Sequence, residues 1–198
     1  MAMQAGTMSD DIGLMPQNKA VRTIVVSGVL AAIQIVLGLT GLGFIPLPTG
    51  VNATILHIPA ILAGVVAGGV AGVATGGIFG LFSFLRATTP LFQNPVIAFG
   101  PRLLIGFVAF IVYRAVKPIN EVLALALAGA LGTLTNTVLV LSLAVLLPSP
   151  AGTPYLAPEL AWTVALTNAP AEVLVATIIT VAVGLAIRGA GRARRSTV

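Results

Sequence analysis

A set of polar side chains in this chain could bind a solute, because they lie in or beside segments that are otherwise almost free of charge. The set is Asn52, His57, Arg86, Gln93, Asn94, Arg102, Asn136, Asn168 and Glu172. Arg102 stands out, since the run from Ala87 to Tyr113 carries no other charge. A cation at membrane depth is costly unless it faces protein or a water-filled cavity, so by default it marks a functional site. We therefore expect Arg102 to hold an anion.

Each of these side chains also has a purely structural interpretation. Arg102 could form a salt bridge to Glu172 inside the protein instead of contacting a ligand. Glu172 follows Asn168 by one helical turn, so the two side chains share a helix face. A lone histidine such as His57 is more often buried and satisfied by the protein than a ligand contact. For Asn136 the default is a hydrogen bond between helices, and contact with a solute is the alternative.

The chain lacks the residues that common enzyme mechanisms need. It has one histidine, five carboxylates and no cysteine, which excludes multi-histidine zinc sites and cysteine nucleophiles. No serine, histidine and acid occur at a spacing that suggests a triad, and no phosphate-binding G-x-x-x-x-G-K-[ST] pattern is present. We therefore expect no catalytic residue, no metal site and no cofactor, and uphill transport would draw its energy from a partner or an ion gradient.

Composition places these polar groups in a membrane protein. Hydrophobic residues make up 58% of the chain and charged residues only 8%, against roughly 25% charged in an ordinary soluble domain. The net charge of +5 does not indicate nucleic-acid binding, because the basic residues flank hydrophobic segments and act as topology signals. We expect a multi-pass protein of the cell membrane with the lipid bilayer as its surroundings.

The hydrophobic segments predict an all-α fold, a compact bundle of six transmembrane helices. The apolar run over residues 53–85 would make a helix of about 50 Å, too long for a hydrocarbon core of about 30 Å and too short for two full spans. We therefore expect two short helices broken near Gly68 and Gly69. The other helices are expected at about residues 21–44, 96–113, 122–147 and 161–187. These give a flexible cytoplasmic tail at 1–18, a membrane domain at 19–190 and a basic cytoplasmic tail at 191–198.

Basic residues predict the orientation, because Lys and Arg concentrate on the cytoplasmic side. Most of them flank segment ends on one face of the expected bundle: Lys19, Arg22, Arg114, Lys117, Arg188, Arg192, Arg194 and Arg195. Both termini should therefore be cytoplasmic. Topology leaves only Arg86 and Arg102 unexplained, both near the outer half. Arg86 could simply extend its charge to the lipid headgroups.

Small residues repeat every four positions in several segments, which allows close backbone approach between membrane helices. One such ladder consists of Gly64, Gly68, Gly72, Gly76 and Gly80. It crosses the expected break, so we expect two helices to share it. The first helix carries two overlapping pairs, Ser27 with Ala31 and Gly28 with Ala32. These could pack within the molecule or form a smooth groove for another subunit, and the sequence leaves both open.

The central stretch ILHIPAILAGVVAGGVAGVATGGIFGLFSFLRATTPLFQNPVIAFGPRLLIGFVAF resembles a known family of membrane proteins. Its I-L-H-I-P opening, the F-L-R before a proline loop, the N-P dipeptide and P-R-L-L-x-G, together with T-N-A-P-A-E near the C-terminus, are similar to substrate-binding S components of energy-coupling factor vitamin importers. The similarity is to the group that contains pantothenate, folate and cobalamin proteins. It covers most of residues 20 to 190.

This resemblance implies a subunit that captures a vitamin from outside, in a pocket capped by the loops after the first, third and fifth helices. It implies docking through the first helix onto a transmembrane coupling subunit that works with two cytosolic ATPases. By position, Arg102 and Asn94 would fall in the pocket, with Asn168 and Glu172 in the matching stretch of the last helix. The docking motif would be the mixed set Ser27, Gly28, Ala31 and Ala32.

The choice of vitamin depends on charge and aromatic content. Two arginines on the binding side favour a carboxylate, because guanidinium can grip it through two hydrogen bonds. Pantothenate and folate carry a carboxylate, whereas cobalamin, rich in neutral amides, does not need this contact. Two tyrosines and one tryptophan argue against a stacking pocket for a large flat pterin. We therefore predict pantothenate, with folate or cobalamin as alternative substrates.

A different class of function also stays open. A self-contained, ion-coupled secondary transporter would be expected to show internal repeats and intramembrane acids. No repeat is apparent in the chain, and Glu172 is the one candidate acid for coupling. An intramembrane enzyme would need a nucleophile and a base, which a single histidine hardly provides.

Overall fold

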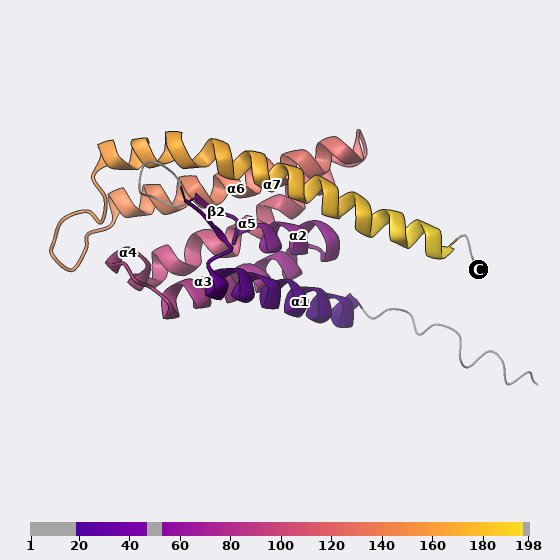
Figure 1. Ribbon diagram of the computed structural model, residues 1–198, viewed down its shortest axis with the longest axis horizontal. Helices are drawn as coiled ribbons and strands as arrows, with labels where there is room; N and C mark the ends of the chain where they lie inside the picture. Colours follow the sequence, from indigo (N-terminus) through magenta and orange to yellow (C-terminus); the bar gives the residue numbers. More distant parts are fainter. Residues whose placement is uncertain (1–18, 47–52, 196–198) are drawn as a thin grey trace, which may run out of the picture.

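The computed structural model describes residues 19–46 and 53–195, and most of them are helical. The elements are α1 (Lys19–Thr40), β1 (Phe44–Ile45), β2 (Ala53–Thr54), α2 (Ile58–Ala67), α3 (Gly69–Leu85), α4 (Pro90–Gln93), α5 (Pro95–Val116), α6 (Glu121–Leu146) and α7 (Pro158–Arg195), as Figure 1 shows. The two short strands pair antiparallel, with Phe44 opposite Thr54 and Ile45 opposite Ala53. The expected all-α class is confirmed, and this pairing is a small addition to it.

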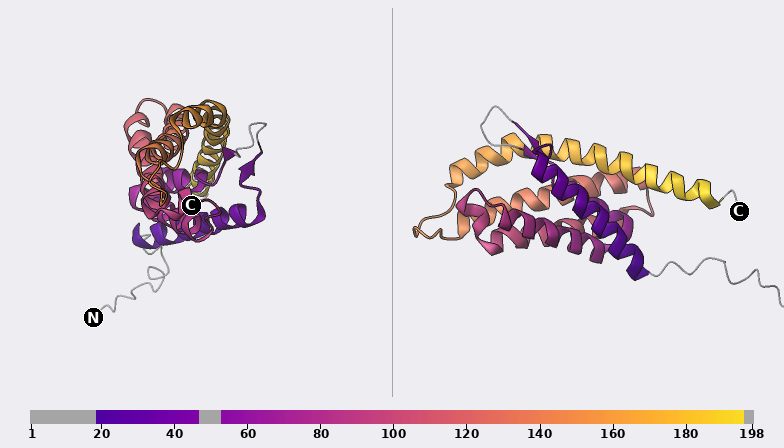
Figure 2. Two further views of the ribbon diagram at one scale, coloured as in Figure 1. Left: turned by 90° about the vertical axis from the view of Figure 1, so that its left-hand side faces the viewer. Right: turned by 60° about the horizontal axis from the view of Figure 1, so that its bottom comes forward.

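The long helices run side by side along the molecule, α3 against α5, α5 against α6 and α6 against α7 (Figure 1). Helix α1 crosses one side of this bundle obliquely and packs on α2 and α3 (Figure 2). The start of α1 and the end of α7 lie at the same end of the bundle (Figure 1). We call the opposite end, which holds α4 and the loop over residues 147–157, the loop end.

Four of the described helices are long and apolar enough to cross a membrane. They are Ala20–Thr40, Pro95–Val116, Glu121–Leu146 and Pro158–Ile187. Two shorter apolar helices, Ile58–Ala67 and Gly69–Leu85, lie among them. The protein is therefore a multi-pass, all-helical membrane protein.

The expected break in the long apolar run is confirmed at Gly68, between α2 and α3. Gly68 has a φ of +105°, a backbone conformation that glycine adopts without the steric cost that other residues meet. Helix α2 is therefore only a short helix, and the chain reverses into α3. The two-helix interpretation of residues 53–85 rests on this one residue.

The glycine ladder brings α2 and α3 against the backbone of α5. A Cβ atom at Gly64 would lie 2.1 Å from the Gly106 carbonyl oxygen, and one at Gly76 would lie 2.0 Å from that of Arg102. Two helices share the ladder, as expected, because Gly64 belongs to α2 and Gly76 to α3. Backbone contact of this kind drives helix association in lipid through van der Waals packing. It also fixes the depth of Arg102 in the bundle.

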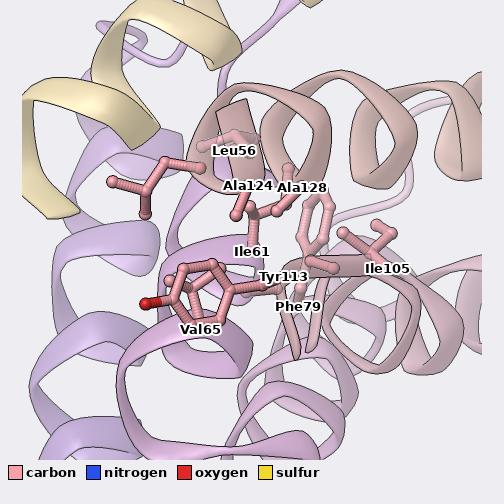
Figure 3. Packing of buried hydrophobic residues seen from close by; sticks show 11 residues of the cluster. Leu56, Ile61, Val65, Phe79, Ile105, Tyr113, Ala124 and Ala128 are labelled. Atoms are coloured by element: carbon pink, nitrogen blue, oxygen red, sulfur yellow. The ribbon is translucent and has the colours of Figure 1, made fainter. Parts of the chain in front are cut away.

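Apolar packing surrounds this contact. Figure 3 shows the main cluster, which includes Leu56, Ile61, Val65, Phe79, Ile105, Tyr113, Ala124 and Ala128. The side chains come from α2, α3, α5 and α6 and from the residues just before α2. The cluster holds the helices in one register, and polar groups inside the bundle therefore keep fixed positions.

An extended stretch inside this bundle precedes α2, and we call residues 53–57 the connecting segment. Backbone groups in lipid must find partners inside the protein, and here side chains and a neighbouring loop supply them. The Gln34 amide donates to the Leu56 carbonyl, and the Thr54 N–H donates to Glu172 Oε1 at 2.7 Å. The Ile55 N–H donates to the Gly43 carbonyl at 2.9 Å. Because polar residues on α1 and α7 satisfy these backbone groups, the chain can remain non-helical until α2 begins at Ile58.

Candidate functional site

A cavity of about 840 Å³ lies at the loop end of the bundle. Its walls come from β1, β2, α3, α4, α5, α6, α7 and the loop over residues 147–157. Small-molecule sites are typically about 300–1,000 Å³, mostly apolar, with a few polar groups that fix the ligand. Among the described residues that line the cavity, Arg102 and Glu172 are the charged ones. These properties make the cavity the candidate binding site.

Arg102 reaches the cavity from α5 and is only 4% exposed. Its Nη1 donates to the Ile97 carbonyl at 2.6 Å. This carbonyl would normally accept from the N–H four residues later, but that residue is Pro101, which has none. The arginine side chain therefore replaces a main-chain hydrogen bond that the proline removes. The adjacent Pro101 and Arg102 act together in placing the guanidinium.

Two aromatic rings hold the guanidinium from the other sides. Its central carbon lies 4.7 Å from the centroid of Phe92 on α4 and 5.3 Å from that of Phe79 on α3. Such cation–π contacts stabilise a desolvated cation. The Nε atom of Arg102 is buried and has no hydrogen-bond partner among the described residues. The group is thus fixed in place with hydrogen-bonding capacity to spare.

The salt bridge between Arg102 and Glu172 does not form in this structure. Glu172, on α7, accepts from the Thr54 N–H through Oε1 and from the Thr137 hydroxyl, at 3.3 Å, through Oε2. Within the described residues, no carboxylate makes an ion pair with the guanidinium of Arg102. The cavity therefore contains a cation and an acid that are held separately by neutral groups.

Asn136 on α6 and Asn168 on α7 also line the cavity. Both side chains are almost completely buried. The Asn136 Oδ1 atom has no hydrogen-bond partner among the described residues, and an unmatched buried amide oxygen is costly unless something binds it. Asn168 Oδ1 accepts from the Thr167 hydroxyl at 3.0 Å. The structure thus brings Arg102, Asn136, Asn168 and Glu172 together around one cavity.

His57 is buried and does not line the cavity. Its Nε2 lies 2.9 Å from the Thr133 hydroxyl, which itself donates to the Gly129 carbonyl at 2.8 Å. Since the hydroxyl proton is used there, the histidine Nε2 carries the proton and donates. His57 therefore attaches the start of α2 to α6, which is the structural interpretation of this residue.

Three other expected site residues, Asn94, Arg86 and Gln93, lie at the loop end without lining the cavity. Asn94 caps α5, where its Oδ1 accepts from the Val96 N–H at 2.9 Å, and its Nδ2 contacts the Tyr155 hydroxyl at 3.4 Å. Arg86 and Gln93 are exposed. Asn52 lies outside the described residues. Asn94 thus links the start of α5 to Tyr155, a residue that does line the cavity.

Several lining residues gave no signal in the sequence. Thr54, Thr137, Phe79 and Phe92 all face the cavity, yet threonine and phenylalanine are common in membrane helices and their spacing does not distinguish them. Gln34 was detectable in principle, because it is a lone amide within an apolar helix. A single amide side chain in an otherwise apolar membrane segment indicates a buried hydrogen bond.

The two small-residue pairs of α1 differ in exposure. Ser27 and Ala31 are buried, and the Ser27 hydroxyl contacts the Ala71 carbonyl at 3.4 Å. Gly28 and Ala32 are exposed, and a Cβ atom at Gly28 would meet nothing within 4 Å. The first pair therefore packs α1 on α3, and the second pair leaves a smooth strip on the outer face of α1.

The sequence is similar to known membrane transport proteins. A family model described as ECF transporter, substrate-specific component, matches residues 22–184. The pantothenic acid transporter PanT of Lactococcus lactis subsp. cremoris is 34% identical, over 69% of this chain and 78% of the relative. The pantothenate transporter PanT of Leuconostoc mesenteroides subsp. mesenteroides is 32% identical, over 67% of this chain and 72% of the relative.

Proposed function

Since the chain belongs to the family of substrate-specific components of ECF transporters, it is a membrane-embedded substrate-binding subunit, and we propose that its substrate is pantothenate. Two relatives at 34% and 32% identity carry the name of pantothenate transporter. The subunit captures pantothenate outside the cell and passes it inward through partner subunits. An anionic vitamin agrees with the guanidinium of Arg102, which lines the cavity and forms no ion pair with an acid among the described residues.

One observation carries this proposal: the guanidinium of Arg102 is buried beside a mostly apolar cavity and is held by two rings and a carbonyl, with no ion pair to an acid among the described residues. A buried cation without an anion is unfavourable in an apolar environment. The carboxylate of pantothenate supplies the missing charge and accepts two parallel hydrogen bonds. Ligand binding therefore offsets the cost of keeping Arg102 in the bundle.

Other parts of the cavity suit the rest of the same molecule. Asn136, which lines the cavity, carries an amide that can hydrogen-bond to the amide group of pantothenate. The apolar lining residues Val140, Leu141 and Leu156 suit its geminal methyl groups. Stacking of a flat pterin is less well supported, because the guanidinium already lies over one face of Phe79 and one face of Phe92. Pantothenate is therefore favoured over folate and over cobalamin.

We also propose six membrane helices with both termini in the cytoplasm. The described start and end of the chain lie together at the end opposite the cavity (Figure 1). The link between α5 and α6, which contains Lys117, lies at that end too. The cavity then faces outward, where a capture subunit needs it. The tails at 1–18 and 191–198 would extend into the cytoplasm.

The partners we propose are a transmembrane coupling subunit and two cytosolic ATPases. The docking surface is the exposed strip of α1 at Gly28 and Ala32, where the side chains are small and a Cβ atom at Gly28 would meet nothing within 4 Å. Small residues of this kind let a partner helix approach closely in lipid. Ser27 and Ala31 contribute indirectly, because they hold α1 against α3 from the inside.

Equilibrium binding to the detergent-purified protein tests the substrate. Isothermal titration with pantothenate, folate and cobalamin should give saturable binding of pantothenate alone. A second measurement, co-purification from cells that also produce an ECF module, tests the partners. Binding of folate or cobalamin in preference to pantothenate would contradict the proposal, as would the absence of pantothenate binding by folded protein.

A further inference from the structure

Glu172 lines the cavity in which we propose that an anion binds, and its carboxylate would repel that anion at close range. It is only 5% exposed, and each of its oxygens receives one hydrogen bond from the described residues. A carboxylate offers about four acceptor positions, so it can still accept donors from a ligand. The Arg102 guanidinium does not use this capacity, because the two groups form no ion pair.

Each of the two charged lining residues has its own group of neighbours, and the two groups come from different elements. Arg102 with Phe79 and Phe92 comes from α3, α4 and α5. Glu172 with its two donors, Thr54 and Thr137, comes from α7, β2 and α6. The first group is cationic and the second is acidic, so a ligand that spans the cavity meets opposite requirements at its two ends.

We infer that Glu172 forms a second subsite, which binds the hydroxyl end of the ligand and excludes a second negative charge there. Asn168, one helical turn before it, lines the same part of α7 and completes the subsite. This inference rests on the proposed pantothenate function. The carboxylate of pantothenate lies at Arg102, and its two hydroxyls donate to the oxygens of Glu172.

The selectivity follows from simple electrostatics. A monoanion with hydroxyl donors satisfies both groups, because its charge pairs with Arg102 and its donors reach Glu172. A ligand with a second anionic group at the hydroxyl end would place that charge beside a buried carboxylate, where little water screens the repulsion. Specificity of this kind depends on a repulsive element as much as on an attractive one. Glu172 therefore acts as the specificity-determining residue.

Three ligands and two variants test the subsite. The ligands are pantothenate, N-(3,3-dimethylbutanoyl)-β-alanine, which has the same carbon skeleton without the hydroxyls, and pantothenate phosphorylated at its primary hydroxyl. The variants are Glu172→Gln, which keeps the size and one acceptor, and Glu159→Gln. Glu159 is an exposed acid on the same helix that does not line the cavity, so its variant is a matched control for the loss of one charge.

The original protein should bind pantothenate about tenfold more tightly than the analogue without hydroxyls, the expected value of a hydrogen bond to a charged group. It should bind the phosphorylated ligand about 100-fold more weakly, because like charges meet. Glu172→Gln should weaken pantothenate about tenfold, leave the analogue without hydroxyls unchanged and reduce the discrimination against the phosphorylated ligand. Glu159→Gln should match the original protein for all three.

The outcomes separate this inference from the proposed function. If the original protein does not bind pantothenate, the proposed function fails and the subsite with it. If pantothenate binds but Glu172→Gln weakens all three ligands by the same factor, Glu172 acts only by holding Thr54 in place and the subsite alone is wrong. Unchanged discrimination against the phosphorylated ligand in Glu172→Gln would also overturn it.

Discussion

The substitution Arg102→Gln should abolish pantothenate binding and also reduce stability, for two different reasons. Loss of one partner of a buried, hydrogen-bonded charge pair costs about 2–5 kcal/mol, which corresponds to a loss of affinity of at least about 30-fold. Separately, the Ile97 carbonyl loses the donor that reaches it at 2.6 Å, since Pro101 has no N–H to offer. An unsatisfied buried carbonyl costs about 1–3 kcal/mol.

A second substitution separates the two effects. Pro101→Ala restores a main-chain N–H to α5, and this N–H can donate to the Ile97 carbonyl as in an uninterrupted helix. The double variant Pro101→Ala/Arg102→Gln should therefore recover most of the lost stability and still fail to bind pantothenate. The single variant Pro101→Ala keeps the guanidinium and serves as the control.

Thermal unfolding in detergent and isothermal titration measure the two quantities on the same samples. Stability should fall in Arg102→Gln and return in the double variant, while the dissociation constant stays at least about 30-fold above that of the original protein in both. If the double variant regained binding together with its stability, Arg102 would be a structural residue. Undiminished affinity in the folded single variant would refute the reasoning as well.

Three further predictions concern packing, the connecting segment and docking. Gly76→Val should strongly lower the unfolding temperature, because its Cβ would lie 2.0 Å from an α5 carbonyl oxygen. Gly77→Ala, whose Cβ would lie 3.4 Å from its nearest neighbour, should be tolerated, and equal unfolding temperatures of the two variants would contradict the packing role of the ladder. Gln34→Leu removes the side-chain donor to the connecting segment, so it should cost about 1–3 kcal/mol of stability and weaken pantothenate binding. Thermal unfolding and titration measure the two effects, and an unchanged unfolding temperature would refute this role of Gln34. Gly28→Leu should leave pantothenate binding intact but reduce co-purification with the coupling subunit, whereas Gly100→Leu, at another open position, should leave co-purification unchanged. Undiminished co-purification of Gly28→Leu would contradict docking through α1.

The local features of the fold were accessible from sequence. Glycine spacing and the length of one apolar run predicted the break at Gly68 and a ladder shared by two helices, and both are confirmed. Such features depend on residues close together in the chain, whose geometry is set by helix periodicity. Charge isolation directed attention to Arg102 in the same way, and the structure places it beside the cavity.

The tertiary contacts were not accessible in this way. The hydrogen bond from Thr54 to Glu172 joins residues 118 positions apart, and no spacing rule connects them. Gln93 and Phe92 are neighbours, yet Phe92 contacts the guanidinium and Gln93 is exposed. The direction of a side chain in the single turn of α4 depends on how that turn packs, which polarity alone does not reveal. Whether Gln93 and Arg86 contribute to binding remains a prediction.

The two charged groups of the cavity have a common physical origin in interrupted helices. In lipid, a backbone that leaves the helical conformation must be satisfied by the protein. Arg102 satisfies the carbonyl that Pro101 leaves unpaired, and Glu172 and Gln34 satisfy the connecting segment. Two of these three side chains, Arg102 and Glu172, also line the cavity. Substitutions at these two positions should therefore change stability and ligand binding together. A second substitution that repairs the backbone separates the two effects at Arg102, and a comparison of ligands that differ in one group separates them at Glu172.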